Sequence, residues 1–183
     1  MDYRLIQVSR ISWCANKACY GAGKVQFQTP PAPYQVTPAP RLGGDAREII
    51  LHHVPKGFRQ FVEDLEASVN TNDLGGRQCI SMLTWDGEMR MTLFQNDTLF
   101  FDIDGQVIQG LQETGVCACL VQVVGVWTSA RSWGLKCVVK EVKEMDPLKV
   151  TTKPSSSWAF REDCNDDVFP SIKPACSDWL FRD

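Results

Sequence analysis

The stretch that decides the fold is VCACLVQVVGVWTSARSWGLKCVVKEVK, residues 116–143. Apolar and β-branched residues dominate it on both sides of a short polar run, 128–132. Such runs are typical of β-strands, and we therefore expect strands at Val116–Trp127 and Trp133–Lys143, joined by that polar turn. The sequence predicts a long β-hairpin with a polar tip.

Shorter strand signals surround this hairpin. Tyr3–Trp13 and Lys24–Gln28 are predicted to pair as a first hairpin, and Ala46–Val54 to form a third strand. A meander is expected next, because Asp-Gly is a strong turn signal between strands. Its predicted strands are Cys79–Trp85, Glu88–Gln95 and Thr98–Ile103.

One segment has a helical period. In Lys56–Asn70, apolar residues recur at spacings of three and four, as in an amphipathic helix: Phe58, Phe61, Val62, Leu65 and Val69. Thr29–Gly44 contains many prolines and is predicted to be a stiff, exposed loop. Beyond Met145, prolines and serines interrupt any periodicity, which favours a tail.

These signals define a fold class. Many short strands with one helix, and no strand–helix alternation, argue against a doubly wound sheet. We expect a mainly β protein, a small antiparallel OB-like Greek-key barrel with one amphipathic helix and an extended C-terminal tail. The expected domains are an OB-like domain at 1–146 and a flexible acidic and aromatic tail at 147–183.

Composition limits the class of protein. The 183 residues suit one domain, and 19 Lys+Arg against 22 Asp+Glu give a net charge of −3. Any anion-binding site must therefore be local, because the chain has no basic surplus. No apolar run is long enough for a membrane span and no signal peptide is evident, so we expect a soluble intracellular protein whose eight cysteines are thiols.

Catalytic and metal-ligating patterns are weak. The two histidines, His52 and His53, are adjacent, so on a strand they would point to opposite faces. The cysteines lack paired Cys-x-x-Cys spacing. We predict no enzyme activity, no metal and no cofactor; the remaining enzyme hypothesis is a small hydrolase that holds a divalent ion at Asp102 and Asp104.

Aromatic residues and isolated cations are interleaved on the long hairpin. Trp127 and Trp133 flank the tip that carries Arg131, and the period of two places Lys136 and Lys140 on one face. Flat rings stack on unpaired bases for roughly 1–3 kcal/mol each, while cations neutralise phosphates. These five residues are predicted to bind nucleic acid; the alternative is that the tryptophans close the core.

A second cluster of the same kind runs from Lys24 and Phe27 to Tyr34 and Arg41. The proline-rich backbone could hold Tyr34 outward as a base platform, at little entropic cost. These four residues are also predicted to bind nucleic acid. Packing of the loop onto the barrel is the alternative.

The end of the chain, 161–183, combines acidic and aromatic residues. It is too polar for a core and too apolar for an inert linker. We predict that it docks partners, the alternative being that its aromatics pack on the barrel. The residues expected to carry docking are Asp166, Asp167, Phe169, Asp178, Trp179 and Phe181.

Three ordered patches, 23–31, 57–66 and 125–142, carry a family resemblance. Together they resemble the OB-fold single-stranded DNA-binding proteins of large eukaryotic DNA viruses, and more distantly the replication proteins of short-tailed phages. The resemblance implies sequence-independent coating of single strands during DNA replication, repair or recombination. It also implies no cofactor and an acidic tail that recruits a polymerase or other replication proteins. Trp127, Arg131, Trp133 and Lys136 match the family's hairpin.

We therefore expect a single-stranded DNA-binding protein, located in the nucleus or a viral replication compartment if it is viral. No membrane partner is expected, and a homodimer is left open. Two alternatives remain: a β-rich protein-interaction or virion structural module, and an RNA-binding OB-type protein. Salt separates the first from DNA binding, because phosphate contacts weaken as salt rises. A 2′-hydroxyl comparison separates the second.

Overall fold

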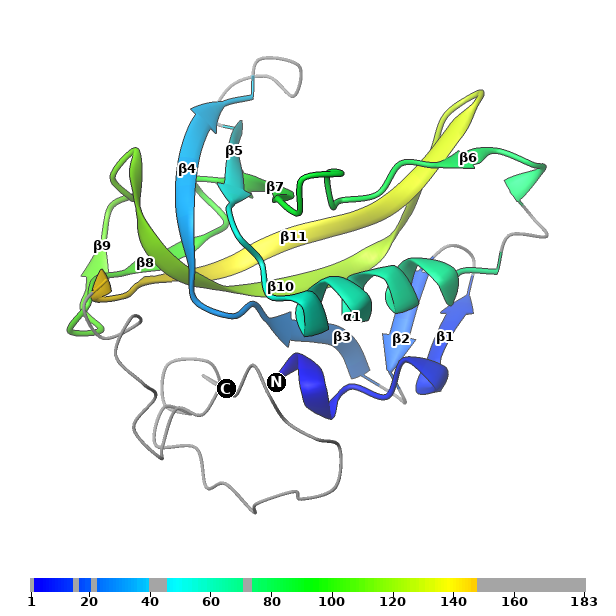
Figure 1. Ribbon diagram of the computed structural model, residues 1–183, viewed down its shortest axis with the longest axis horizontal. Helices are drawn as coiled ribbons and strands as arrows, with labels where there is room; N and C mark the ends of the chain where they lie inside the picture. The colour runs from blue at the N-terminus through cyan, green and yellow to red at the C-terminus, as the bar shows by residue number, and fades with distance from the viewer. Residues whose placement is uncertain (1, 15–16, 21–22, 40–45, 71–73, 148–183) are drawn as a thin grey trace.

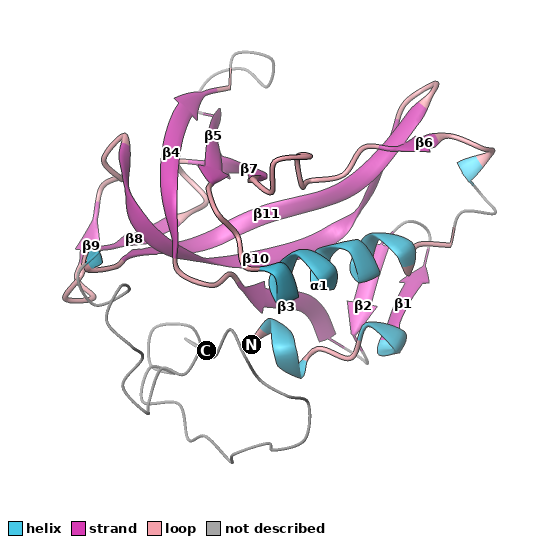
Figure 2. Cartoon of the chain, in the orientation of Figure 1, coloured by secondary structure: helices cyan, strands magenta, loops and turns pink. Residues whose placement is uncertain are grey.

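The computed structural model describes residues 2–14, 17–20, 23–39, 46–70 and 74–147. These residues are mainly β with one α-helix, α1 (Lys56–Ala67), as Figure 2 shows. Two short 3-10 helices, η1 (Tyr3–Leu5) and η2 (Val8–Arg10), precede the sheet. The strands are β1 (Ile11–Cys14), β2 (Lys17–Tyr20), β3 (Gly23–Gln28), β4 (Ala32–Pro38), β5 (Ala46–Leu51), β6 (Gln78–Cys79), β7 (Met89–Phe94), β8 (Leu99–Phe101), β9 (Val107–Ile108), β10 (Thr114–Thr128) and β11 (Ser132–Glu144).

The β10–β11 hairpin is the centre of the fold and confirms the sequence prediction (Figure 1). Strands β3 and β4 both pair with β10, β5 pairs with β4, and β7 pairs with β5, all antiparallel. The chain thus has the mainly β, OB-like arrangement that the sequence predicts.

The sheet is mixed and is not closed into a barrel, so the OB-like arrangement is open and contains parallel pairs beside the antiparallel ones that the sequence predicts. Strand β7 lies near β11 without pairing with it. The reason is that β6 and β8 pair with β11 in parallel, at Ser132–Trp133 and Glu141–Lys143. A strand has only two edges, and these short strands pair with five of the thirteen residues of β11, at both ends of the edge that a closing ladder would need.

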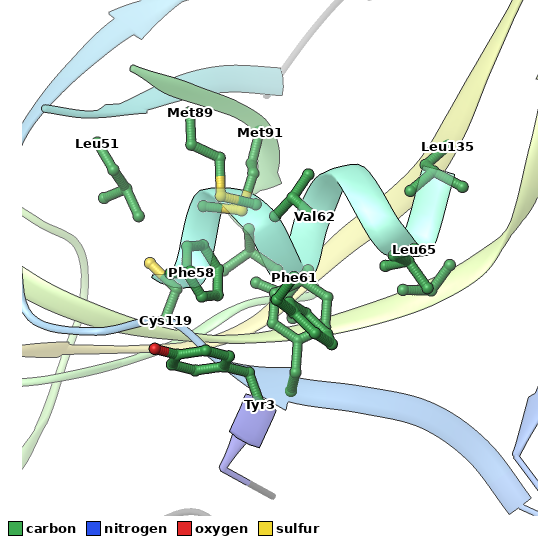
Figure 3. Packing of buried hydrophobic residues seen from close by; sticks show 14 of the residues in the cluster. Tyr3, Leu51, Phe58, Phe61, Val62, Leu65, Met89, Met91, Cys119 and Leu135 are labelled. Carbon is green, nitrogen blue, oxygen red and sulfur yellow. The ribbon is translucent and has the colours of Figure 1, made fainter. Parts of the chain in front are cut away.

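The core lies between α1 and one face of the sheet. The apolar stripe of the helix is buried as predicted, through Phe58, Phe61, Val62 and Leu65. Phe27 of β3 meets Phe58 and Phe61 at ring-centroid distances of 5.8 and 5.2 Å. Figure 3 shows Phe58 and Val62 of the helix beside Met89 and Met91 of β7. The side of β3, β10 and β11 that carries Phe27 is therefore the inner face.

Two segments differ from the sequence prediction. Tyr3–Arg10 forms 3-10 turns instead of a strand, and the buried ring of Tyr3 packs edge-on against Phe58 at 4.8 Å. The proline segment contains β4 instead of an exposed loop. Its apolar residues Ala32 and Tyr34 point inward. Pro33 is exposed and takes part through its carbonyl, which accepts a hydrogen bond from the His52 N–H at 2.8 Å.

Four cysteines in the described ranges, Cys79, Cys117, Cys119 and Cys137, are free thiols, as expected. The sulfur atoms of Cys117 and Cys119 lie 3.9 Å apart in the core. Burial raises the pKa of the Cys137 thiol to about 12 and that of Cys79 to about 11. These thiols act as small apolar groups in the packing.

Candidate nucleic-acid interface

The face of β3, β10 and β11 opposite the helix carries polar and cationic side chains, and we call it the outer face. Strand alternation places Lys24 and Gln26 there, because Val25 and Phe27 point into the core. The register opposes Gln26 to Gln122 and Gly125 to Lys136. The outer face therefore runs continuously across three adjacent strands.

Trp127 lies on this face near the hairpin tip. Its cross-strand partner is Gly134, and a Cβ at that position would lie 2.8 Å from two atoms of the Trp127 ring. The indole thus lies directly against the Gly134 backbone, which only a residue without a side chain allows. Trp127 remains 37% exposed. Gly134, which pairs with Trp127, and Lys136 are two residues apart on β11, so Trp127 and Lys136 share a face.

Trp133 points to the other side of the hairpin. It is 5% exposed and belongs to the hydrophobic core, and it pairs with Thr128 instead of Trp127. The prediction that both tryptophans stack on bases is therefore wrong for Trp133. The core alternative describes it correctly.

The hairpin tip is fixed by the segment that follows α1. The Gln78 N–H donates to the Arg131 carbonyl at 3.0 Å, and the Ile80 N–H donates to the Trp133 carbonyl at 2.7 Å. The Arg77 Nε donates to the Ser129 carbonyl at 2.7 Å. The exposed side chain of Arg131 is therefore carried by a tip that segment 77–80 holds through hydrogen bonds.

The predicted cations of this region are accessible to different degrees. Lys24, Arg131 and Lys136 are exposed, and Lys140 is half-buried. Lys140 lies at a bulge, since Leu120 pairs with Glu141 and Val121 with Val139. None of the four cations forms an ion pair within the described ranges. Their charge is available to an anionic ligand.

Two predicted aromatic contacts are wrong. Phe27 has no exposed surface because it is packed between the helix phenylalanines, and Tyr34 is only 2% exposed. The Tyr34 hydroxyl donates to Glu144 Oε1 at 3.1 Å. Burial, together with the Glu144 charge, raises the Tyr34 pKa well above its usual value. Tyr34 is thus a packing residue and not an outward base platform.

The remaining predicted residues cannot be placed. Arg41 lies outside the described residues, and so do the tail residues Asp166, Asp167, Phe169, Asp178, Trp179 and Phe181.

The sequence prediction also missed the polar pair at the centre of the outer face. Gln26 Nε2 donates to Gln122 Oε1 at 3.5 Å. Strand alternation on β3 and β10 would have identified both glutamines as outward residues.

The alternative hydrolase site finds no support in the geometry. Asp102 Oδ1 accepts the Gln106 N–H at 2.8 Å, so this carboxylate closes its own turn. His52 Nδ1 lies 2.7 Å from Glu88 Oε1, while His53 is exposed with a positive φ of 54°. Among the described residues, no three His, Cys, Asp or Glu side chains gather as a metal site.

Comparisons with known proteins give distant structural similarity. No protein-family model matches the chain, and no curated protein matches its sequence. The single-stranded DNA-binding protein from bacteriophage Enc34 is 10% identical, with a TM-score of 0.44, over 73% of this chain and 86% of that one. Its C-terminal truncation is 11% identical, with a TM-score of 0.45, over 76% and 97%. The same protein in complex with ssDNA is 9% identical, with a TM-score of 0.44, over 74% and 93%.

These neighbours come from a phage, so the resemblance to proteins of large eukaryotic viruses stays a prediction. Within the described ranges, α1 and the short helices fall below the length and hydropathy of a membrane-spanning helix.

Proposed function

We propose that this protein binds single-stranded DNA through its outer face, without enzymatic activity and with weak sequence preference. One observation carries the proposal. The partly exposed indole of Trp127, seated on Gly134, shares a face with Lys136 and adjoins the tip that carries Arg131. A flat ring stacks on any base, and neighbouring cations neutralise the phosphates on either side of it.

The geometry favours an unpaired strand as the ligand. Stacking on Trp127 needs a base whose face is free, which a duplex does not offer. The glutamines of the outer face can donate and accept hydrogen bonds, so they tolerate all four bases. Lys24 lies on β3, next to β10 of the hairpin, and provides a further phosphate contact for the bound DNA strand. Affinity should come from stacking and charge, with little sequence readout.

The test is a titration of a labelled DNA homopolymer at several salt concentrations. Trp127→Ala is expected to weaken binding by about 1–3 kcal/mol, because the stacked ring is lost. Lys136→Ala is expected to reduce the slope of log affinity against log salt by about 0.7, the value for one phosphate contact on a single strand. Leu5→Ala and Arg10→Ala are the matched controls, because both residues are exposed and lie on the N-terminal helical turns, outside the outer face.

Three results would contradict the proposal. Trp127→Ala could bind as tightly as the wild type, Lys136→Ala could leave the same salt slope as Arg10→Ala, or binding could be independent of salt. The last result would favour a protein-interaction module, because an apolar interface responds little to salt. An RNA homopolymer of the same base is measured in parallel, and tighter binding to it would replace DNA by RNA as the ligand.

We also propose that the protein coats strands exposed in replication, repair or recombination, and that its acidic segment 161–183 docks replication proteins such as a polymerase. The domain boundary at 146 belongs to the same proposal. Its support is composition, because this segment combines acidic residues with aromatic ones. Deleting 161–183 is expected to preserve or strengthen DNA binding and to abolish a partner contact. Weaker DNA binding by the truncated protein would contradict it.

A further inference from the structure

The most exposed large apolar side chain of the described residues lies away from the outer face. Trp85, in the segment between β6 and β7, is 98% exposed. Trp127, which carries the proposed function, is far less exposed. Tryptophan is normally largely buried and is enriched at binding hot spots. A ring presented so completely to solvent therefore needs an explanation.

Trp85 is held by an ordered turn. The Thr84 N–H donates to the Glu88 carbonyl at 2.8 Å, and the Glu88 N–H donates to Thr84 Oγ1 at 3.1 Å. The Thr84 hydroxyl also donates to the Asp86 carboxylate. Gly87 completes the turn with a φ of 81°. Because the backbone on both sides of the ring is already ordered, a ligand that stacks on it need not order the turn.

One cation of α1, Arg59, lies beside this turn, and a second, Lys56, lies one helical turn before it. The Arg59 side chain passes over Gly87, since a Cβ there would lie 2.9 Å from Arg59 Nη1. Lys56 and Arg59 share one side of the helix and line a shallow hollow of about 230 Å³ with Gln60 and Glu63. Neither cation forms an ion pair with another described residue.

The neighbouring carboxylates are mostly engaged. Asp86 accepts from Thr84, and Glu88 contacts His52 at 2.7 Å and Arg90 at 3.5 Å. Glu63 is the exception. Asp86 keeps its negative charge, because the Thr84 hydroxyl is neutral, and Lys56 and Arg59 are the cations without an ion pair that remain near the turn. A ligand that combines a flat ring with an anionic group fits this arrangement, and a nucleotide has both.

We propose that Trp85, Lys56 and Arg59 form a second contact for single-stranded DNA, in which a base stacks on Trp85 and its phosphates meet the two cations. This inference rests on the proposed function. The Ile80 carbonyl borders the seat of Trp127, because a Cβ on Gly134 would lie 2.8 Å from it. The chain from Ile80 to Trp85 reaches at most about 18 Å. One strand within the usual OB-fold site size of about 4–16 nucleotides can meet both rings.

The experiment compares DNA homopolymers of about 4 and about 16 nucleotides, lengths that bracket that site size, on the full chain. Trp85→Ala is expected to weaken binding of the long strand by about 5- to 150-fold and to leave the short strand nearly unchanged, because the short strand occupies the outer face alone. Trp85→Phe keeps a stacking ring and should retain most of the long-strand affinity. Leu5→Ala, which also removes an exposed apolar side chain, is the control and should bind both strands like the wild type.

A second measurement removes a negative charge near the two cations. Glu63→Gln removes the one unengaged carboxylate of the hollow and should tighten long-strand binding, whereas Glu113→Gln, which changes the net charge equally elsewhere, should not.

The outcomes separate the two proposals. If the wild type binds neither strand, the proposed function fails. If the wild type binds both and Trp127→Ala weakens both while Trp85→Ala binds the long strand normally, only the second contact is overturned. The Trp85 turn would then be a surface for a protein partner.

Discussion

The seat of Trp127 makes Gly134→Ala the most informative single change. A Cβ at this position would lie 2.8 Å from Trp127 Cε2, from Trp127 Cζ2 and from the Ile80 carbonyl oxygen, whereas ordinary contact begins at 3.4 Å. The indole can swing away. The carbonyl oxygen belongs to the backbone segment whose N–H donates to Trp133, and it cannot move without straining that hydrogen bond. We expect a destabilisation of about 1–3 kcal/mol, the usual effect of overpacking.

For a chain of this length, that change lowers the melting temperature by roughly 2–12 °C, at about 2–4 °C per kcal/mol. Circular dichroism during heating measures it, and the DNA titration should show weaker binding because Trp127 has left its seat. Gly57→Ala is the control of opposite sign. Its nearest neighbour is the Tyr3 hydroxyl at 3.8 Å, so the helix should gain roughly 0.5–1 kcal/mol. If Gly134→Ala leaves the melting temperature and the tryptophan emission unchanged, the close packing of the Trp127 ring on the Gly134 backbone is refuted.

Two further predictions test the buried residues. Phe27→Ala is expected to destabilise the fold by about 3–5 kcal/mol in denaturant titrations, because the ring is fully buried against Phe58 and Phe61. The folded fraction should still bind DNA normally, and a specific loss of affinity would restore Phe27 as a contact. Burial raises the pKa of Glu66 above its usual 4.5, so this group stabilises the folded state most at acidic pH, and that stability is lost as pH rises through the raised value. Glu66→Gln should flatten this part of the stability–pH profile, and an unchanged profile would contradict the assignment.

Local periodicity was enough to predict the elements that organise the fold. The apolar spacing of Phe58, Phe61 and Leu65 identified α1, because a helix buries one stripe whatever it packs against. The β10–β11 hairpin followed equally from its own residues. Strand β4 was missed because prolines outweighed the alternation of Ala32, Tyr34 and Val36, which shows only when the neighbouring strands are in place.

The faces of the two tryptophans depended on register, which periodicity does not supply. Thr128 pairs with Trp133, so Trp127 and Trp133 point to opposite sides of the hairpin. A shift by one residue would have placed the two rings on the same face. The register is set at the tip, where Ser129 and Ser132 hydrogen-bond each other through backbone and side chain. The exposure of Trp85 has a local cause. Asp86 and Gly87 form a tight turn, and Trp85, the residue before them, therefore lies at the end of a hairpin.

A net charge of −3 is compatible with DNA binding because the decisive charge is local. Four cations without ion pairs in the described ranges, Lys24, Arg131, Lys136 and Lys140, lie on or next to the outer face. At about 0.7 per phosphate contact on a single strand, they give a salt slope near −3. A fourfold rise in salt should then weaken binding by roughly 50-fold. A slope this shallow leaves most of the affinity to stacking, so the contribution of Trp127 should grow in relative terms as salt rises.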